Sequence, residues 1–208
     1  SHDLLSKLDI PARLAFDSLP IKAKEWLDTQ KAGGPRSKTI ILAGSSKFST
    51  ESLPALKRMG ALIEEAGYEM AVLSGAALHH SNDDAAFLAT LEQAFGRPPQ
   101  VIDAGSLDEW FGVLHQSPLL ISGRFHYTIA AAALGTPFIA FEGNTPKLHA
   151  LSEFLDAPPP LSYSSPDLTV EITIRLTKMM ESLPETTAQG GEKLVDMLAL
   201  AAENYKGL

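Results

Sequence analysis

This 208-residue sequence has no cysteine, no excess of positive charge and no long hydrophobic run. Without cysteine there can be no disulfide, no thiolate metal ligand and no cysteine nucleophile. The 17 lysine and arginine residues against 25 aspartate and glutamate residues give a net charge of -8. A field of that sign disfavours nucleic acid and anionic membrane surfaces as partners.

The sequence also lacks targeting and membrane signals. No run of about 18 apolar residues is present, so we expect no membrane span. The N-terminus shows no basic segment followed by an apolar one, which favours a cytoplasmic protein. The chain starts at Ser1-His2 without a methionine, and we therefore expect it to be part of a longer protein.

What is present is a globular composition, with 45% hydrophobic and 20% charged residues. The length suits one α/β domain with a sizeable core. We expect a helical segment over residues 1–37, a Rossmann-like α/β domain over 38–165, and C-terminal helices over 166–208 that pack on the same domain. Leu4, Leu5 and Leu8 share one face of the first expected helix.

From residue 38 onward, apolar strands alternate with amphipathic helices in five successive βα units. Continuously apolar strands such as Thr39 to Ala43 indicate a parallel sheet covered by helices on both faces. The sequence therefore predicts a doubly wound α/β fold of five to six parallel strands, Leu161-Ser-Tyr being the possible sixth. The expected strands are 39–43, 69–73, 100–102, 119–121 and 138–141, and the expected helices are 49–66, 83–95, 107–116, 127–134, 146–155, 166–183 and 192–205.

Charged residues follow the fourth expected strand, where Arg124 and His126 precede an alanine-rich helix. Ligands of open parallel sheets bind outside the carboxyl ends of the strands. An arginine there can hold a carboxylate or phosphate with two hydrogen bonds, and a histidine can act as general acid or base. The alternative is an ordinary surface arginine with a hydrogen-bonded histidine.

The fifth expected strand ends in a second polar turn, which carries Glu142, Asn144 and Lys147. Glu142 could orient His126 or accept a sugar hydroxyl, and Lys147 could neutralise an anion. The alternative is a capped loop with no ligand. Because both strand ends lie at one edge of the sheet, we take Arg124 and His126 as the catalytic candidates and these residues as substrate-binding candidates beside them.

Two further loops complete the candidate site. Ser45, Ser46 and Lys47 follow the first strand ahead of a helix, where free backbone N–H groups favour anions. Their spacing is not that of a Walker motif, and a simple N-cap is the alternative. His80, in the polar loop at residues 79–84, could line the same cleft. The ligand spacing of that loop does not suit a metal, and we expect neither a metal nor a cofactor.

With these residues identified, the chain resembles the C-terminal half of the polysaccharide pyruvyl transferase family over about residues 38–156. The family pattern of a strand, Arg-x-His, an alanine-rich helix, Gly-x-Pro, a strand and an Asn-x-x-Lys turn is matched in order. The matching segments are Ser122-Gly-Arg124-Phe-His126, Ala130 to Ala133, Gly135-Thr-Pro137, Phe138 to Phe141 and Asn144-Thr-Pro-Lys147. Ser45-Ser46-Lys47 departs from the family, in which an arginine is more usual.

The resemblance implies a GT-B-like half that transfers a pyruvyl group from phosphoenolpyruvate to a saccharide hydroxyl. Arg124 would then bind the phosphate or carboxylate of phosphoenolpyruvate, His126 would act as acid or base, and Lys147 would add positive charge. Residues 1–37 are too few to form the other half, so a partner domain or homo-oligomer is expected. A nucleotide-sugar glycosyltransferase half and a non-catalytic binding module remain the alternatives.

Overall fold

The computed structural model describes residues 15–30, 33–44, 50–74 and 82–206. Its centre is a parallel sheet in the order β3-β2-β1-β4-β5. The order reverses between β1 and β4, which is the topological switch point of a doubly wound fold. The predicted fold class is confirmed. The strands are β1 (Thr39–Ala43), β2 (Glu69–Ser74), β3 (Gln100–Asp103), β4 (Leu120–Ser122) and β5 (Phe138–Ala140).

The register brings the carboxyl ends of the central strands to one edge of the sheet. Ala43 at the end of β1 pairs with Ser122 of β4, which pairs in turn with Ala140 of β5. On the other side, Ser74 of β2 pairs with Asp103 of β3. Segments that follow different strands therefore begin close together, as the sequence analysis required.

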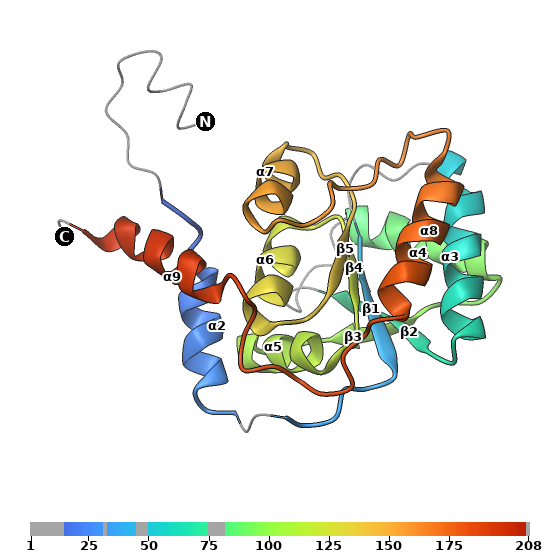
Figure 1. Ribbon diagram of the computed structural model, residues 1–208. Coiled ribbons are helices and arrows are strands. Elements are labelled where there is room, and N and C mark those ends of the chain that lie inside the picture. The colour runs from blue at the N-terminus through green and yellow to red at the C-terminus, as the bar shows by residue number, and fades with distance from the viewer. Residues whose placement is uncertain (1–14, 31–32, 45–49, 75–81, 207–208) are drawn as a thin grey trace, which may run out of the picture.

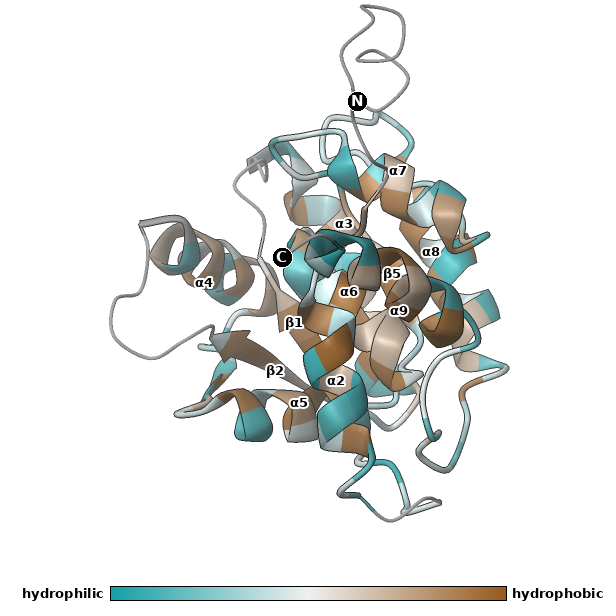
Figure 2. Cartoon of the chain, turned by 90° about the vertical axis from the view of Figure 1, so that its left-hand side faces the viewer, coloured by the Kyte–Doolittle hydropathy of each residue, from teal (hydrophilic) through white to brown (hydrophobic). Residues whose placement is uncertain are grey.

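Helices cover both faces of the sheet (Figure 1). One face carries α3, α4 and α8, and the other carries α5 and α6, with α2 and α9 outside α6. Figure 2 views the molecule from the α2 and α9 side, where both helices lie in front of α6. The helices are α2 (Leu19–Leu27), α3 (Leu53–Glu65), α4 (Asn82–Phe95), α5 (Leu107–Gln116), α6 (Phe125–Leu134), α7 (Lys147–Phe154), α8 (Leu168–Met180) and α9 (Leu194–Ala202), with short 3₁₀ turns η1 (Thr50–Ser52) and η2 (Glu203–Tyr205).

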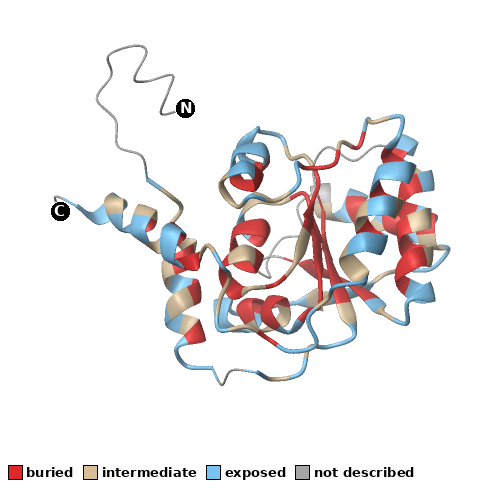
Figure 3. Cartoon of the chain, in the orientation of Figure 1, coloured by how far each residue is buried: buried red, intermediate tan, exposed pale blue. Residues whose placement is uncertain are grey.

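The strands are coloured mainly as buried in Figure 3, and their apolar side chains join cores on both faces of the sheet. Along β1, Ile40 and Leu42 join the core beneath α3, α4 and α8, whereas Ile41 and Ala43 join the core beneath α5 and α6. The period-two alternation of a strand thus explains why β1 is apolar at each of these positions. Ala23 and Leu27 of α2 belong to the second core, so the N-terminal helix packs on the same side of the sheet as α6.

Two expected elements differ in the structure. Leu161-Ser-Tyr forms no sixth strand in the described part: Leu161 makes a single parallel bridge to Phe141, and the chain then leaves the sheet. The helix expected from Pro166 begins at Leu168 and ends at Met180. Within the described residues, no helix has the length and apolar character needed to cross a bilayer.

The amino edge of the sheet is tied together by one arginine that the sequence analysis did not identify. The Arg36 guanidinium donates to the carbonyl oxygens of His115 at 2.8 Å, Ser117 at 2.6 Å and Gly135 at 2.8 Å. These oxygens lie at the C-terminal ends of α5 and α6, where helices leave unpaired carbonyls and favour a cation. Burial lowers the pKa of Arg36 from its usual value.

Candidate functional site

Arg124 lies just after the end of β4, at the switch point of the sheet. It is the N-cap residue of α6 and has an extended backbone, and its N–H donates to Oγ of Ser122 at 2.9 Å. The preceding Gly123 donates its N–H to the Ala43 carbonyl oxygen at 3.3 Å, which joins this turn to the end of β1. A Cβ on Gly143 would lie 3.1 Å from the Gly123 oxygen, so the turns after β4 and β5 are also packed closely.

The Arg124 side chain contacts α4. Its guanidinium donates to the carboxylate of Asp84, and their side chains are 34% and 19% exposed. Asp84 belongs to the first turn of α4, where the helix dipole favours a negative charge. A guanidinium has five N–H donors, and one carboxylate oxygen engages only part of this donor set. Arg124 is therefore both anchored and able to bind a second anion.

His126 lies in the first turn of α6 and contacts a different segment. Its Nε2 is 3.2 Å from Oδ2 of Asp17, and their side chains are 68% and 24% exposed. Oδ1 of Asp17 accepts the N–H of Leu19 at 2.8 Å, at the start of α2. The suggestion that Glu142 orients His126 is therefore not supported, because the carboxylate that contacts His126 belongs to Asp17.

A cavity of about 560 Å³ opens beside His126, between the starts of α2, α5 and α6. Its volume is in the range of small-molecule sites. Its walls are mainly apolar, and Asp17, Ser106 and His126 are among the polar groups. The lining residues are Asp17, Ser18, Leu19, Lys22, Ala104, Gly105, Ser106, Leu107, Trp110, His126 and Tyr127. Arg124 is not among them, so the two residues of the motif face different surroundings.

The β3 to α5 wall of this cavity is held by a capping arrangement. Ser106 accepts the N–H of Glu109 at 3.2 Å, and the Glu109 carboxylate accepts the N–H of Gly105 at 2.7 Å. Paired bonds of this kind stabilise the start of a helix. Across the cavity, the Tyr127 hydroxyl donates to the Leu73 carbonyl at 3.1 Å, and burial raises the pKa of Tyr127. The cavity is thus preformed.

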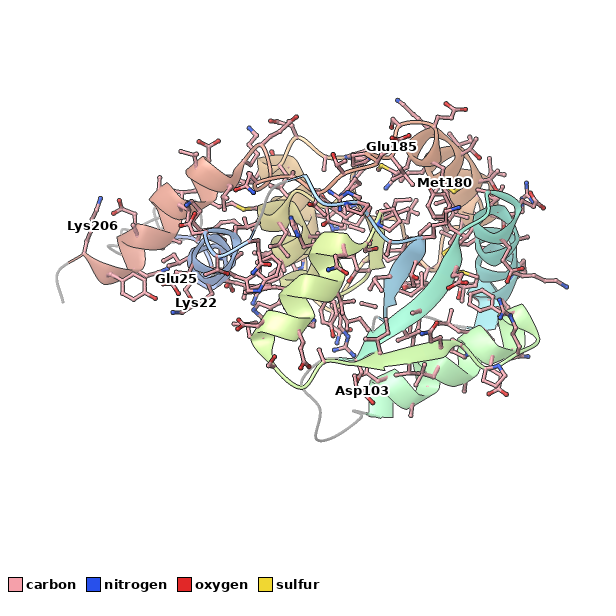
Figure 4. The ribbon with its side chains drawn as sticks, turned by 90° about the horizontal axis from the view of Figure 1, so that it is seen from below. Lys22, Glu25, Asp103, Met180, Glu185 and Lys206 are labelled. Carbon is pink, nitrogen blue, oxygen red and sulfur yellow. The ribbon has the colours of Figure 1, made fainter. Side chains whose placement is uncertain are left out.

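Lys22 adds little free positive charge to this cavity. It projects from α2 beside Glu25 (Figure 4), and its Nζ donates to Oε2 of Glu25 at 2.7 Å. This hydrogen bond raises the pKa of Lys22. The carboxylate of Glu25 offsets the charge of the ammonium, and His126 supplies the imidazole among the residues that line this cavity.

The polar turn after β5 lies on the α7 side. Oε2 of Glu142 accepts the Ser162 hydroxyl at 2.8 Å, and its Oε1 is 3.6 Å from Nε2 of His149. Nζ of Lys147 lies 5.5 Å from the centre of the Phe125 ring, a cation–π contact next to Arg124 in the chain. Asn144 is exposed. The structure thus brings Lys147 near the Arg-x-His turn and directs Glu142 away from it.

Four predicted site residues, namely Ser45, Ser46, Lys47 and His80, lie outside the described residues, as do Leu4, Leu5 and Leu8. Over the described ranges, no group of three or more histidine, aspartate or glutamate side chains could hold a metal ion.

Sequence reasoning missed the two carboxylates that contact the motif. Asp84 was part of the polar 79–84 loop but was not paired with Arg124, and Asp17 was not identified as a candidate. His115 was also missed as a buried group: its Nε2 is 2.8 Å from the Ala188 oxygen, and burial lowers its pKa. A histidine among apolar residues at the end of α5, next to the central strand, was the available signal for its burial.

Comparison with solved structures shows the fold. The UDP-forming α,α-trehalose-phosphate synthase of Burkholderia xenovorans aligns with a TM-score of 0.50 and 16% identity, over 92% of this chain and 48% of that chain. The α,α-trehalose 6-phosphate synthase of Burkholderia multivorans aligns with a TM-score of 0.50 and 13% identity, over 92% and 46%. The chain thus has the fold of one Rossmann-like half of a GT-B enzyme and spans about half the length of these proteins.

No curated protein matches the sequence. A family model described as polysaccharide pyruvyl transferase matches residues 1–145, which include β1 to β5, Arg124 and His126. This match covers well over half of the chain and supports a transferase. The chain therefore belongs to the polysaccharide pyruvyl transferase family.

Proposed function

We propose that this domain takes part in transferring the pyruvyl group of phosphoenolpyruvate to a saccharide acceptor. The observation that carries the proposal is the Arg-x-His turn at the switch point, where Arg124 and His126 follow β4 directly and Gly123 is hydrogen-bonded to β1. Family membership supplies the reaction class, and the site supplies a cation and a proton-exchanging group at the expected edge of the sheet.

Arg124 binds the donor in this account. Phosphoenolpyruvate carries a carboxylate and a phosphate, and a guanidinium can hold either group with two parallel hydrogen bonds. Asp84 fixes the guanidinium from the α4 side, and the remaining N–H groups are available for the ligand. Lys147, over the Phe125 ring, adds a second positive charge near the same turn.

His126 handles protons during the transfer. Ketal formation joins two acceptor hydroxyl oxygens to C2 of phosphoenolpyruvate, adds a proton to C3 and releases inorganic phosphate. The two hydroxyl groups lose two protons, of which one is gained by C3 and one leaves with the phosphate. An exposed imidazole can accept the hydroxyl proton or supply a proton to the donor near neutral pH. The cavity that His126 lines gives the acceptor a place within reach of its ring.

The rest of the enzyme is also part of the proposal. Because the chain spans about half of the structures that it matches, we place a partner domain or a second copy across the carboxyl edge of the sheet. The acceptor is a saccharide hydroxyl, and the reaction takes place in the cytoplasm, where phosphoenolpyruvate is formed. We also propose donor contacts from four residues of the loops after β1 and β2, namely Ser45, Ser46, Lys47 and His80.

The donor assignment is tested by calorimetric titration of phosphoenolpyruvate into the 208-residue chain and its Arg124→Gln variant. Loss of the charged hydrogen bond from Arg124 to the ligand costs about 1.5–3 kcal/mol, so we expect the affinity for phosphoenolpyruvate to fall roughly 10- to 150-fold. Arg97→Gln, which removes an exposed arginine paired with Glu64, is the matched control. Equal affinity in both variants, or binding of UDP-glucose in place of phosphoenolpyruvate, would contradict the assignment.

A further inference from the structure

The contact between His126 and Asp17 joins the Arg-x-His turn to a segment outside the sheet. Nε2 of His126 and Oδ2 of Asp17 are 3.2 Å apart, and both residues line the same cavity. We propose that Asp17 is a positioning residue for His126, which fixes the imidazole so that Nδ1 is the nitrogen that exchanges protons with the substrate. The catalytic use of this nitrogen rests on the proposed function, whereas the tautomer that Asp17 selects does not depend on it.

Asp17 is held in place from several sides. Its Oδ1 accepts the Leu19 N–H at 2.8 Å, which leaves Oδ2 directed to the imidazole. The neighbouring Phe16 donates its N–H to the Leu200 oxygen at 3.2 Å, and its own carbonyl oxygen accepts Nδ2 of Asn204 at 2.6 Å. Helix α9 and the η2 turn, which lie beyond the region matched by the family model, thus position this carboxylate.

The chemistry follows from the hydrogen-bonding capacity of the two groups. A carboxylate only accepts hydrogen bonds, so a neutral imidazole facing it places its proton on Nε2 and leaves the lone pair on Nδ1. When the ring takes its second proton on Nδ1, its Nε2–H still faces the Asp17 carboxylate. The His126 side chain is 68% exposed, and an exposed ion pair of this kind adds little to folding stability. The contact therefore acts on ring orientation and tautomer.

Long-range ¹H–¹⁵N spectroscopy of the histidine ring tests the tautomer directly. At a pH about two units above the ordinary imidazole pKa, we expect His126 of the 208-residue chain to show the nitrogen shifts of a single Nε2–H tautomer. In Asp17→Ser, the shifts should move to the averaged values of free histidine. A serine at position 17 can still accept the Leu19 N–H but is too short to reach the ring, so the turn is kept. Asp28→Asn, at the far end of α2, is the control and should match the wild type.

Kinetics in the active assembly provide the second readout. Asp17→Ser should lower kcat about tenfold to hundredfold with an unchanged Kd for phosphoenolpyruvate, because Arg124 is untouched. Asp17→Asn, whose amide oxygen can still accept from Nε2, should keep the tautomer and recover part of the rate. An averaged tautomer in the wild type, or an unchanged kcat in Asp17→Ser, would overturn the inference. If the wild type has the single tautomer but transfers no pyruvyl group, the proposed function fails, whereas the tautomer role of Asp17 stands.

Discussion

Replacement of Arg36 should destabilise the fold far more than replacement of a surface arginine. Its guanidinium is half-buried and donates to three carbonyl oxygens at 2.6–2.8 Å, from His115, Ser117 and Gly135. Arg36→Met keeps much of the side-chain volume but removes all these donors. The carbonyls at the ends of α5 and α6 then lose both their partner and the favourable charge.

The size of the effect follows from these contacts. A hydrogen bond in a folded protein contributes about 1 kcal/mol net, and more when the donor is charged. Three such bonds give about 3 kcal/mol, which corresponds to a decrease in Tm of roughly 6–12 °C for a domain of this size. Arg36→Lys retains the charge but cannot reach all three oxygens, so we expect about half of this loss.

Equilibrium unfolding in urea gives the measurement. The midpoint should fall in Arg36→Met while the slope stays constant, since the surface exposed on unfolding hardly changes. Arg97→Met removes an arginine whose side chain is 67% exposed and should leave the midpoint nearly unchanged. A loss below about 1 kcal/mol in Arg36→Met, or equal losses in both variants, would refute the view that Arg36 holds the two helix ends.

Three further predictions follow from single contacts. Burial lowers the pKa of His115, so the folded protein binds fewer protons than the unfolded chain just below pH 6.5. The stabilising contribution of neutral His115 is complete above that pH, and the free energy of unfolding falls on acidification by up to about 1.4 kcal/mol per pH unit. His115→Gln should remove this part of the pH dependence. A Cβ on Gly191 would lie 1.7 Å from the Ala132 oxygen, so Gly191→Ala should shift the chain off α6 and lower stability by more than about 2 kcal/mol in thermal unfolding. Asp84→Asn should tighten phosphoenolpyruvate binding severalfold by calorimetry, because the neutral amide can still accept from Arg124 but no longer offsets its positive charge beside the anion.

Each of these changes has a matched control. His149→Gln replaces a histidine that is half exposed and should keep the acid slope. Gly34→Ala places a Cβ 3.8 Å from its nearest neighbour and should be tolerated. Asp103→Asn removes a carboxylate at the end of β3 and should leave donor affinity unchanged. A variant that behaves like its control would contradict the role that we assign to the corresponding contact.

The fold was predictable because its signals are local. The limits of β1 at Thr39–Ala43 and of α5 at Leu107–Gln116 agree with the expected ranges, since apolar runs and a serine N-cap define them in the sequence. The possible sixth strand at Leu161 did not form: a short apolar pair after three prolines suits an edge strand, but only one bridge to Phe141 is made. Local propensity cannot show how far a pairing continues, because pairing depends on the partner strand.

The site was predictable only in part. Arg124 and His126 could be located because a strand, a turn and a helix follow one another in the sequence. Their partners could not, since Asp84 lies 40 residues from Arg124 and Asp17 belongs to the segment before α2. The same limit applies to Arg36, whose acceptors His115 and Gly135 are 79 and 99 residues away. Contacts between charged groups distant in sequence follow from the packing of whole elements.

The most direct test of the proposed activity is phosphate release from phosphoenolpyruvate by His126→Ala in the presence of its partner half and a saccharide acceptor. Removal of an acid or base lowers the rate about 100- to 10,000-fold when its proton transfer contributes to the transition state. We predict that loss, with phosphoenolpyruvate still bound as tightly as by the wild type because Arg124 and Lys147 are intact. Unchanged phosphate release by His126→Ala would contradict the assignment of proton transfer to this residue.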